Sequence, residues 1–189
     1  VLVSATSVVI FGYFDYQAAK ETLEKESFNK LTAVREMKAQ QIENYFDTLN
    51  DLVITFAQSD TAIEAAKGFR AAFEEIYQNV NLDSYTETSL ENYYESEFIT
   101  RLSPNMLDSS GLVARDFISP NPATQYLQKT YIADNPYPTG EKDKLYRLED
   151  GSSYDVAHTR HHPVFRKLLE TFGFYDIFIL DPKDGYILY

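Results

Sequence analysis

Three histidines, His158, His161 and His162, are the residues whose type and spacing come closest to a metal-binding arrangement. On a helix, His158 and His162 lie four residues apart on one face, which is the spacing of zinc-binding helices. The glutamate that follows the first histidine in such motifs is absent, and a third ligand would have to be a distant carboxylate such as Asp155 or Glu170. The pattern therefore favours histidines that pack and hydrogen-bond, and we assign no metal ligand and no catalytic residue.

The same histidines allow a second, weaker interpretation as an acid-sensitive contact with carboxylate-rich helices, because an unperturbed histidine gains its charge near pH 6.5.

Other catalytic signals are missing from the sequence. No GxSxG, GxxxxGK[ST] or GxGxxG run occurs, so serine hydrolase, P-loop and dinucleotide-binding functions lack local support. The absence of Cys excludes thiolate zinc sites, cysteine catalysis and disulfides. We expect neither an enzyme nor a cofactor in this chain.

Tyrosines are the second group of residues with chemical potential, and the chain has fifteen of them. Several surround the predicted boundary between a helical layer and a sheet. Phenol rings combine stacking with hydrogen bonding, so these residues either pack amphipathically or line a small-molecule pocket. The candidate ligand-binding residues are Tyr126, Tyr131, Tyr154 and Tyr175.

The composition of the chain limits the classes of partner that it can bind. Its 189 residues include 17 Lys plus Arg and 29 Asp plus Glu, giving a net charge of −12 that argues against nucleic-acid binding. With 44% hydrophobic and 15% aromatic residues, the composition is that of a folded protein. A chain without Cys is compatible with an oxidising, extracytoplasmic space.

The first fourteen residues carry no charge until Asp15. At 1.5 Å per residue they reach about 21 Å, short of the roughly 30 Å hydrocarbon core of a bilayer. We interpret residues 1–16 as the end of a transmembrane helix; a core element and a targeting segment are the alternatives. Aromatic residues typical of a membrane interface follow the apolar run at Tyr13, Phe14 and Tyr16.

A seven-residue apolar repeat marks the region that follows. It predicts a helix over residues 18–59, about 60 Å long, with a seam that Arg35 and Lys38 interrupt. This helix either lies on the surface of a single domain or pairs with its copy in a parallel dimer. The expected dimer-interface residues are Phe28, Leu31, Ile42, Leu49 and Phe56.

The remainder of the chain mixes helices, loops and strands. All seven Pro and five of the seven Gly follow residue 103. Further helices are expected over residues 61–77, 83–99, 123–133 and from a cap at Ser152 or Ser153 to a terminator at Gly173. Residues 175–189 read as strand, turn and strand. Because a lone hairpin is marginal, more sheet is expected beyond it, and the predicted fold class is α+β.

Two segments resemble double Cache sensor domains, the PAS-like extracytoplasmic modules of bacterial receptors: LTAVREMKAQQIENYFDTLNDLV, residues 31–53, and GFYDIFILDPKDGYILY, residues 173–189. The resemblance implies four regions: residues 1–16 at the membrane, long sensor helices over 17–77, a helical and loop-rich segment over 78–172, and the first hairpin of a PAS-like sheet over 173–189. The chain has no Trp, which amino-acid-binding members use, so no ligand-binding residue is carried over.

These features together predict a ligand-sensing extracytoplasmic domain of a membrane receptor. It would bind a small molecule, form a homodimer and contact the cell membrane through its N-terminal segment. A histidine kinase, nucleotide cyclase or chemotaxis output would lie outside this chain. The alternatives are a structural or adhesive surface protein assembled through the long helix and, less favoured, a histidine-based metal hydrolase.

Overall fold

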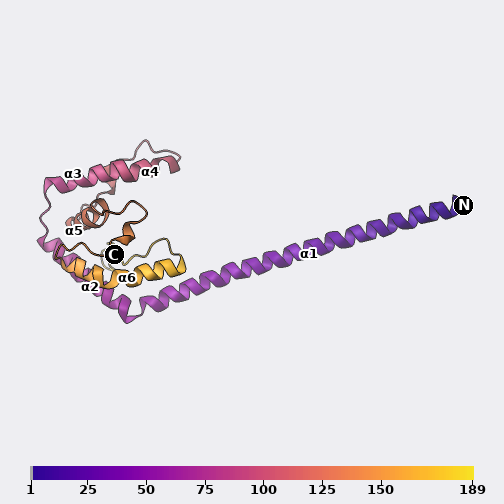
Figure 1. Cartoon of the computed structure of the whole chain (residues 1–189), viewed down its shortest axis with the longest axis horizontal. Helices are drawn as coiled ribbons and strands as arrows, with labels where there is room; N and C mark the ends of the chain where they lie inside the picture. The colour runs from indigo at the N-terminus through magenta and orange to yellow at the C-terminus, as the bar shows by residue number, and fades with distance from the viewer. Residues whose placement is uncertain (1) are drawn as a thin grey trace. The chain divides into compact units, whose positions relative to one another are not determined.

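The computed structural model describes residues 2–189, with side chains described for residues 6, 7 and 10–189. The chain divides into two units, residues 1–58 and residues 59–189. The first unit is a single helix, α1 (Leu2–Ala57). The second unit holds the other helices, a set of short turns and the C-terminal segment, residues 174–189 (Figure 1).

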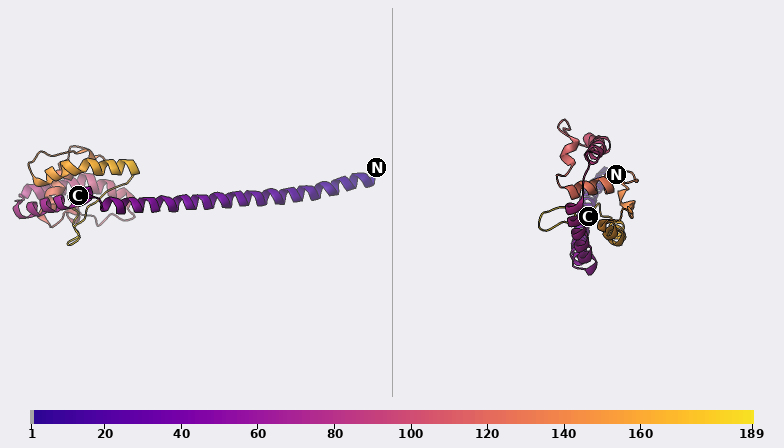
Figure 2. Two further views of the ribbon diagram at one scale, coloured as in Figure 1. Left: turned by 90° about the horizontal axis from the view of Figure 1, so that it is seen from below. Right: turned by 90° about the vertical axis from the view of Figure 1, so that its left-hand side faces the viewer.

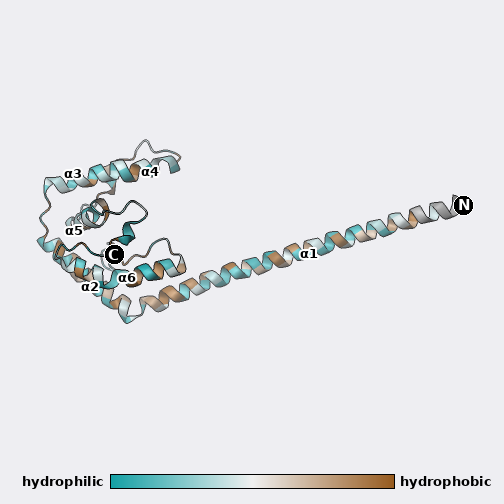
Figure 3. Cartoon of the chain, viewed as in Figure 1, coloured by the Kyte–Doolittle hydropathy of each residue, from teal (hydrophilic) through white to brown (hydrophobic). Residues whose placement is uncertain are grey.

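Helix α1 is continuous because nothing in its sequence interrupts the backbone ladder. It contains no Pro and one Gly, and its 56 residues correspond to about 84 Å at 1.5 Å per residue. Apolar and polar residues alternate along its length in Figure 3. Phe28, Leu31 and Ile42 of the repeat are exposed, whereas Leu49 and Phe56 are half-buried.

The expected transmembrane end at residues 1–16, of which residue 1 lies outside the described part, is not supported. Within residues 2–189, no helix combines the length and the apolar character that crossing a bilayer requires.

The second unit is built from helical segments of α, 3₁₀ and π type. In chain order they are α2 (Asp60–Asn79), α3 (Ser84–Tyr93), η1 (Tyr94–Ile99), α4 (Thr100–Leu102), η2 (Ser103–Asn105), η3 (Ala114–Phe117), α5 (Pro122–Leu127), η4 (Gln128–Ala133), η5 (Lys142–Lys144) and α6 (Ser153–Phe172). Helix α6 packs along α2, and α5 with η4 contacts both α2 and α3. Both views of Figure 2 show the C-terminal loop, in yellow, projecting from these helices.

Local capping signals fix the ends of the two long helices of this unit. The Ser59 hydroxyl accepts a hydrogen bond from the Ala62 N–H at 3.3 Å, and the Ser152 hydroxyl accepts one from the Asp155 N–H at 3.0 Å. Gly173 ends α6 in the left-handed region at φ 68°, where a glycine costs least. Of the two candidate caps at Ser152 and Ser153, Ser152 is the one that caps α6, and the predicted terminator at Gly173 is confirmed.

The core lies mainly between α2 and α6. Phe69 of α2 is fully buried and Phe165 of α6 nearly so, and burial of each ring contributes about 2–3 kcal/mol. The two helices pack closely at Gly68, where an added Cβ atom would lie 3.8 Å from that of Ala157, an ordinary contact distance. A smaller apolar cluster joins Leu90 and Tyr94 to the loop helix η3.

The predicted α+β class is wrong, because residues 2–189 contain no sheet. The two expected strands pair through one isolated antiparallel bridge between Leu180 and Ile187 and neighbouring backbone hydrogen bonds, but within residues 2–189 no third strand joins them. Leu188 of the second arm is buried and donates its N–H to the Ile179 carbonyl at 2.7 Å, whereas its own carbonyl accepts a hydrogen bond from the Tyr154 hydroxyl of α6 at 2.9 Å. The PAS-like sheet, and with it the structural basis of the double Cache resemblance, is therefore not supported.

Candidate functional site

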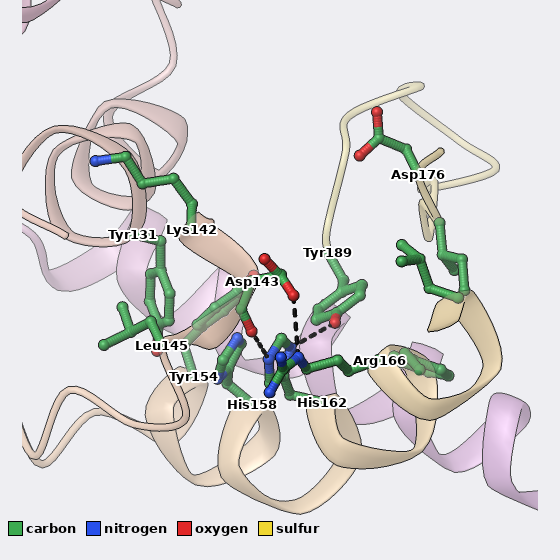
Figure 4. Close-up of a pocket in the computed structure, with 13 residues that line it drawn as sticks. Tyr131, Lys142, Asp143, Leu145, Tyr154, His158, His162, Arg166, Asp176 and Tyr189 are labelled. Carbon is green, nitrogen blue, oxygen red and sulfur yellow. Dashed lines mark hydrogen bonds and ion pairs between the residues drawn. The ribbon is translucent and has the colours of Figure 1, made fainter. Parts of the chain in front are cut away.

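A cavity of about 220 Å³ lies between α6, the short turn η5 and the C-terminal segment (Figure 4). We call it the aromatic cavity, because six of its thirteen lining residues carry aromatic rings. These rings belong to Tyr131, Tyr154, His158, His162, Phe165 and Tyr189. Charged side chains also line it, from Lys142, Asp143, Arg166 and Asp176.

One face of α6 supplies four of these rings. Tyr154, His158 and His162 follow one another at intervals of four residues, and Phe165 follows three residues later. Residues three and four apart share a helix face, so the spacing alone directs the four side chains to the same side. The one-face placement of His158 and His162 is thus explained by helix geometry without a metal.

His162 is held between two fixed partners. Its Nε2 lies 2.7 Å from the Asp143 carbonyl oxygen and its Nδ1 lies 2.7 Å from the Tyr189 hydroxyl. A carbonyl only accepts, so Nε2 carries the proton, and in the neutral ring Nδ1 accepts a hydrogen bond from the Tyr189 hydroxyl. Dashed lines in Figure 4 mark both interactions.

His158 is stacked on His162, with ring centroids 4.3 Å apart and ring planes 18° from parallel. Its Nδ1 lies 3.2 Å from the Tyr146 carbonyl oxygen and therefore donates. Burial, reinforced by repulsion from His162, lowers the pKa of His158 to about 4. His158 is consequently neutral at pH 7, and its Nε2 carries a lone pair that has no hydrogen-bond partner within residues 2–189.

The phenol hydroxyls around the cavity act as donors to other groups. The Tyr154 hydroxyl donates to the Leu188 carbonyl at 2.9 Å, and the Tyr131 hydroxyl lies 3.4 Å from Asp155 Oδ1, a long contact. Burial raises the pKa of Tyr131, Tyr154 and Tyr189 above that of a free tyrosine. The three phenols are therefore uncharged at neutral pH.

Most of the charge at the cavity is already paired. The Lys142 ammonium donates to the Ile132 carbonyl at 2.8 Å and the Asn135 carbonyl at 3.1 Å, and burial lowers its pKa. Arg166 donates through Nε to Asp143 at 3.0 Å, and its Nη2 lies 3.1 Å from a Glu170 oxygen. These pairs leave little positive charge for a ligand.

The structure brings together two of the four tyrosines that the sequence singled out. Tyr131 and Tyr154 line the cavity and their ring centroids lie 5.1 Å apart. Tyr126 lies outside the lining, where its hydroxyl donates to Asp150 and its pKa is raised to about 12, chiefly by burial. Tyr175 is 96% exposed and does not line the cavity either.

Sequence reasoning missed Phe165 and Tyr189. Phe165 had a usable signal, because it lies seven residues after His158 and so falls on the same helix face. Tyr189 had none: it reaches the cavity only because the C-terminal segment folds back onto α2 and α6, with its ring 5.0 Å from that of Phe69 and 4.9 Å from that of Phe165.

The described residues offer no metal centre. Within residues 2–189, no three His, Asp or Glu side chains come together in a way that could hold a metal ion. His158 and His162 face each other as stacked rings, and three of their four nitrogens have protein partners.

The apolar stripe of α1 is the second candidate site, as an interaction surface. We define it as Phe28, Leu31, Ile42, Leu49 and Phe56, the residues expected at a dimer interface. Phe28, Leu31 and Ile42 are 71%, 67% and 58% exposed. Large apolar side chains on such a row mark an interaction surface more often than chance exposure does.

The chain matches no family model, no curated protein and no solved structure. The resemblance to double Cache domains therefore has no support from the fold or from known families, and the function is argued from the two sites alone.

Proposed function

We propose that the chain is the ligand-sensing, extracytoplasmic part of a membrane receptor that signals through paired copies of α1. A small molecule occupies the aromatic cavity, and the helix pair carries the response. One observation supports this most: the rings that line the cavity also pack on α2, the helix that begins three residues after α1 ends. Phe69 of α2 lies 5.2 Å from the Tyr154 ring and 5.0 Å from the Tyr189 ring.

The contact between the cavity and α2 extends beyond these rings. Arg70 lies 3.6 Å from the Asp181 carboxylate in the C-terminal turn, and Phe73 contacts Tyr186 at 5.7 Å between centroids. At the start of α6, the Ser153 hydroxyl donates to Glu75 at 2.6 Å. A ligand that moves Tyr189 or α6 therefore acts on several points along α2.

Pairing of α1 with a second copy is supported by its repeat. Identical helices with an apolar residue every 3.5 positions bury those residues against each other. The stripe is interrupted at Arg35 and Lys38, which lie at seam positions and are expected to loosen the pair there. A loosened seam permits two arrangements of the helices, which a ligand can bias only if it binds one of them more tightly.

A structural or adhesive role is the competing function, and the same stripe favours it. In that case α1 forms a permanent assembly and the cavity stays without a ligand. The two functions differ in what a small molecule does to stability and pairing, so they can be separated by experiment.

The test is a thermal-shift screen with a library of anionic, cationic and neutral small molecules. A ligand at 100 times its dissociation constant adds about 2.7 kcal/mol to stability. Sensing predicts compounds that raise the melting temperature of the native protein but not that of Leu169→Trp, which fills the cavity. Leu168→Trp, one position away and outside the lining, is the matched control. A screen without such compounds favours the structural role.

A further inference from the structure

The size of the aromatic cavity limits its ligand to about one ring. Drug-sized ligands occupy pockets of roughly 300–1,000 Å³, whereas an apolar cavity of about 150 Å³ is enough to hold benzene. The aromatic cavity, at about 220 Å³, lies between these values. It has room for one six-membered ring and a few substituent atoms.

The walls favour an aromatic ring over an aliphatic one. Ring centroids of neighbouring wall residues lie 5.1 Å apart for Tyr131 and Tyr154, and 4.9 Å apart for Phe165 and Tyr189. The rings of these pairs are edge-on or tilted to each other. An aromatic guest gains from such surfaces through offset and edge-to-face contacts.

The charges at the cavity disfavour an anion. Lys142 and Arg166 are engaged with carbonyls and carboxylates of the protein. Asp176, the remaining charged lining residue, has no ion pair within residues 2–189 and adds negative charge. A carboxylate or phosphate ligand would meet this charge with no free cation to oppose it.

The hydrogen-bonding groups that line the aromatic cavity favour a ligand that carries a hydrogen-bond donor. The hydroxyls of Tyr154 and Tyr189 already donate to protein acceptors, and both protonated histidine nitrogens donate to carbonyls. The neutral His158 ring keeps one unpartnered acceptor, Nε2, on a side chain that lines the cavity. A ligand O–H or N–H that reaches this nitrogen gains a hydrogen bond that the protein itself does not supply.

We infer that the aromatic cavity binds a small, uncharged aromatic molecule with a hydrogen-bond donor, of the phenol class, which donates to His158 Nε2. This inference rests on the proposed function and names the chemical class of its ligand.

Four probes of similar size test it by isothermal titration calorimetry at pH 7: phenol, anisole, cyclohexanol and benzoate. Phenol is expected to bind with a dissociation constant on the order of 1 mM or tighter. Anisole, which lacks the donor, is expected to bind about tenfold more weakly. Cyclohexanol, which lacks the ring, and benzoate, which is an anion, should both bind more weakly than phenol. Equal binding of phenol and anisole, or tighter binding of benzoate, overturns the inference.

Two variants locate the donor's partner. His158→Phe keeps a ring in the wall but removes Nε2, so it should weaken phenol about tenfold and leave anisole unchanged. Tyr131→Phe removes a hydroxyl that is directed to Asp155 and should leave the preference for phenol intact. A His158→Phe protein that still prefers phenol contradicts the assignment. If that variant does not fold, the comparison of phenol with anisole in the native protein decides.

Failure of this inference and failure of the proposed function give different results. If phenol does not bind but another compound from the screen does so in a cavity-dependent way, the ligand class is wrong and sensing stands. If phenol binds with the predicted preference but leaves the pairing of α1 unchanged, the ligand class is supported and sensing fails.

Discussion

His158 is the residue whose chemistry depends most on its surroundings. A free histidine is half-protonated near pH 6.5, whereas burial lowers the pKa of His158 in the folded protein to about 4. The unfolded chain therefore binds a proton at a pH where the folded chain does not. The contribution of the neutral His158 ring to the free energy of unfolding is therefore fully present above about pH 6.5. It is lost as the pH falls toward 4.

This predicts a measurable pH dependence. Between pH 7 and pH 5, His158 should reduce the free energy of unfolding by about 2 kcal/mol. Urea denaturation of the native protein and of His158→Phe at both pH values isolates this contribution, because the other titrating groups are common to the two proteins. The native protein should lose more stability than the variant. Equal losses would show that the ring is not held neutral by the fold.

At the same scale, side-chain roles could be predicted only where the sequence carries a local signal. The shared helix face of His158 and His162 follows from their spacing. The choice between Tyr131 and Tyr126 does not, because they lie five residues apart and only tertiary packing directs Tyr131 to the cavity and Tyr126 to Asp150. Tyr175 was chosen for a sheet that does not form.

Among the elements, α2 and α6 pack closely at Gly68, which faces Ala157. A Cβ atom there would lie 3.8 Å from that of Ala157, an ordinary contact distance. Gly68→Ala should therefore raise the free energy of unfolding by about 0.5–1 kcal/mol through reduced backbone freedom. Gly68→Leu should lower it by about 1–3 kcal/mol through overpacking.

Urea denaturation measures both effects. Ala71→Leu, at an exposed position of the same helix, is the control for added size and should change little. A neutral result for Gly68→Leu would mean that α2 and α6 do not approach each other closely at this point.

The seam of α1 supports a second element-scale prediction. Replacing Arg35 and Lys38 with Leu extends the apolar stripe without interruption and should tighten the dimer at least tenfold, or about 1.4 kcal/mol. Sedimentation equilibrium measures the dissociation constant. Lys30→Leu with Gln40→Leu makes the same kind of change outside the seam and should not tighten it. Equal effects of the two pairs of substitutions would contradict the assigned seam.

Helices were predictable because their signals are local. Ser59, Ser152 and Gly173 mark helix ends through bonds and backbone angles that involve near neighbours only. The strands predicted in the C-terminal segment were wrong because a strand depends on distant partners and not on local signals. The residue pattern of this segment is typical of strands, but a strand needs partners elsewhere in the chain, and here Leu188 is buried in a helical environment while its carbonyl pairs with Tyr154.

In the whole molecule, two features that the sequence offered separately are joined. The helix repeat predicted a surface for pairing, and the tyrosines predicted a pocket. The structure supplies the ring contacts that connect the pocket to α2, with Phe69 touching both Tyr154 and Tyr189. The sensing hypothesis depends on this connection, since a ligand with no effect on α2 has no route to the helix pair.

The central claim is that occupancy of the aromatic cavity changes how two copies of α1 pair. The chain has no Cys, so Gln40→Cys introduces a single site for a spin label on the side of α1 away from the seam. Pulsed electron spin resonance then measures the distance between the labels of two chains. The account predicts a defined interchain distance that shifts when phenol saturates the cavity, and no shift when Leu169→Trp is also present. An absent interchain distance, or one that phenol leaves unchanged, would contradict it.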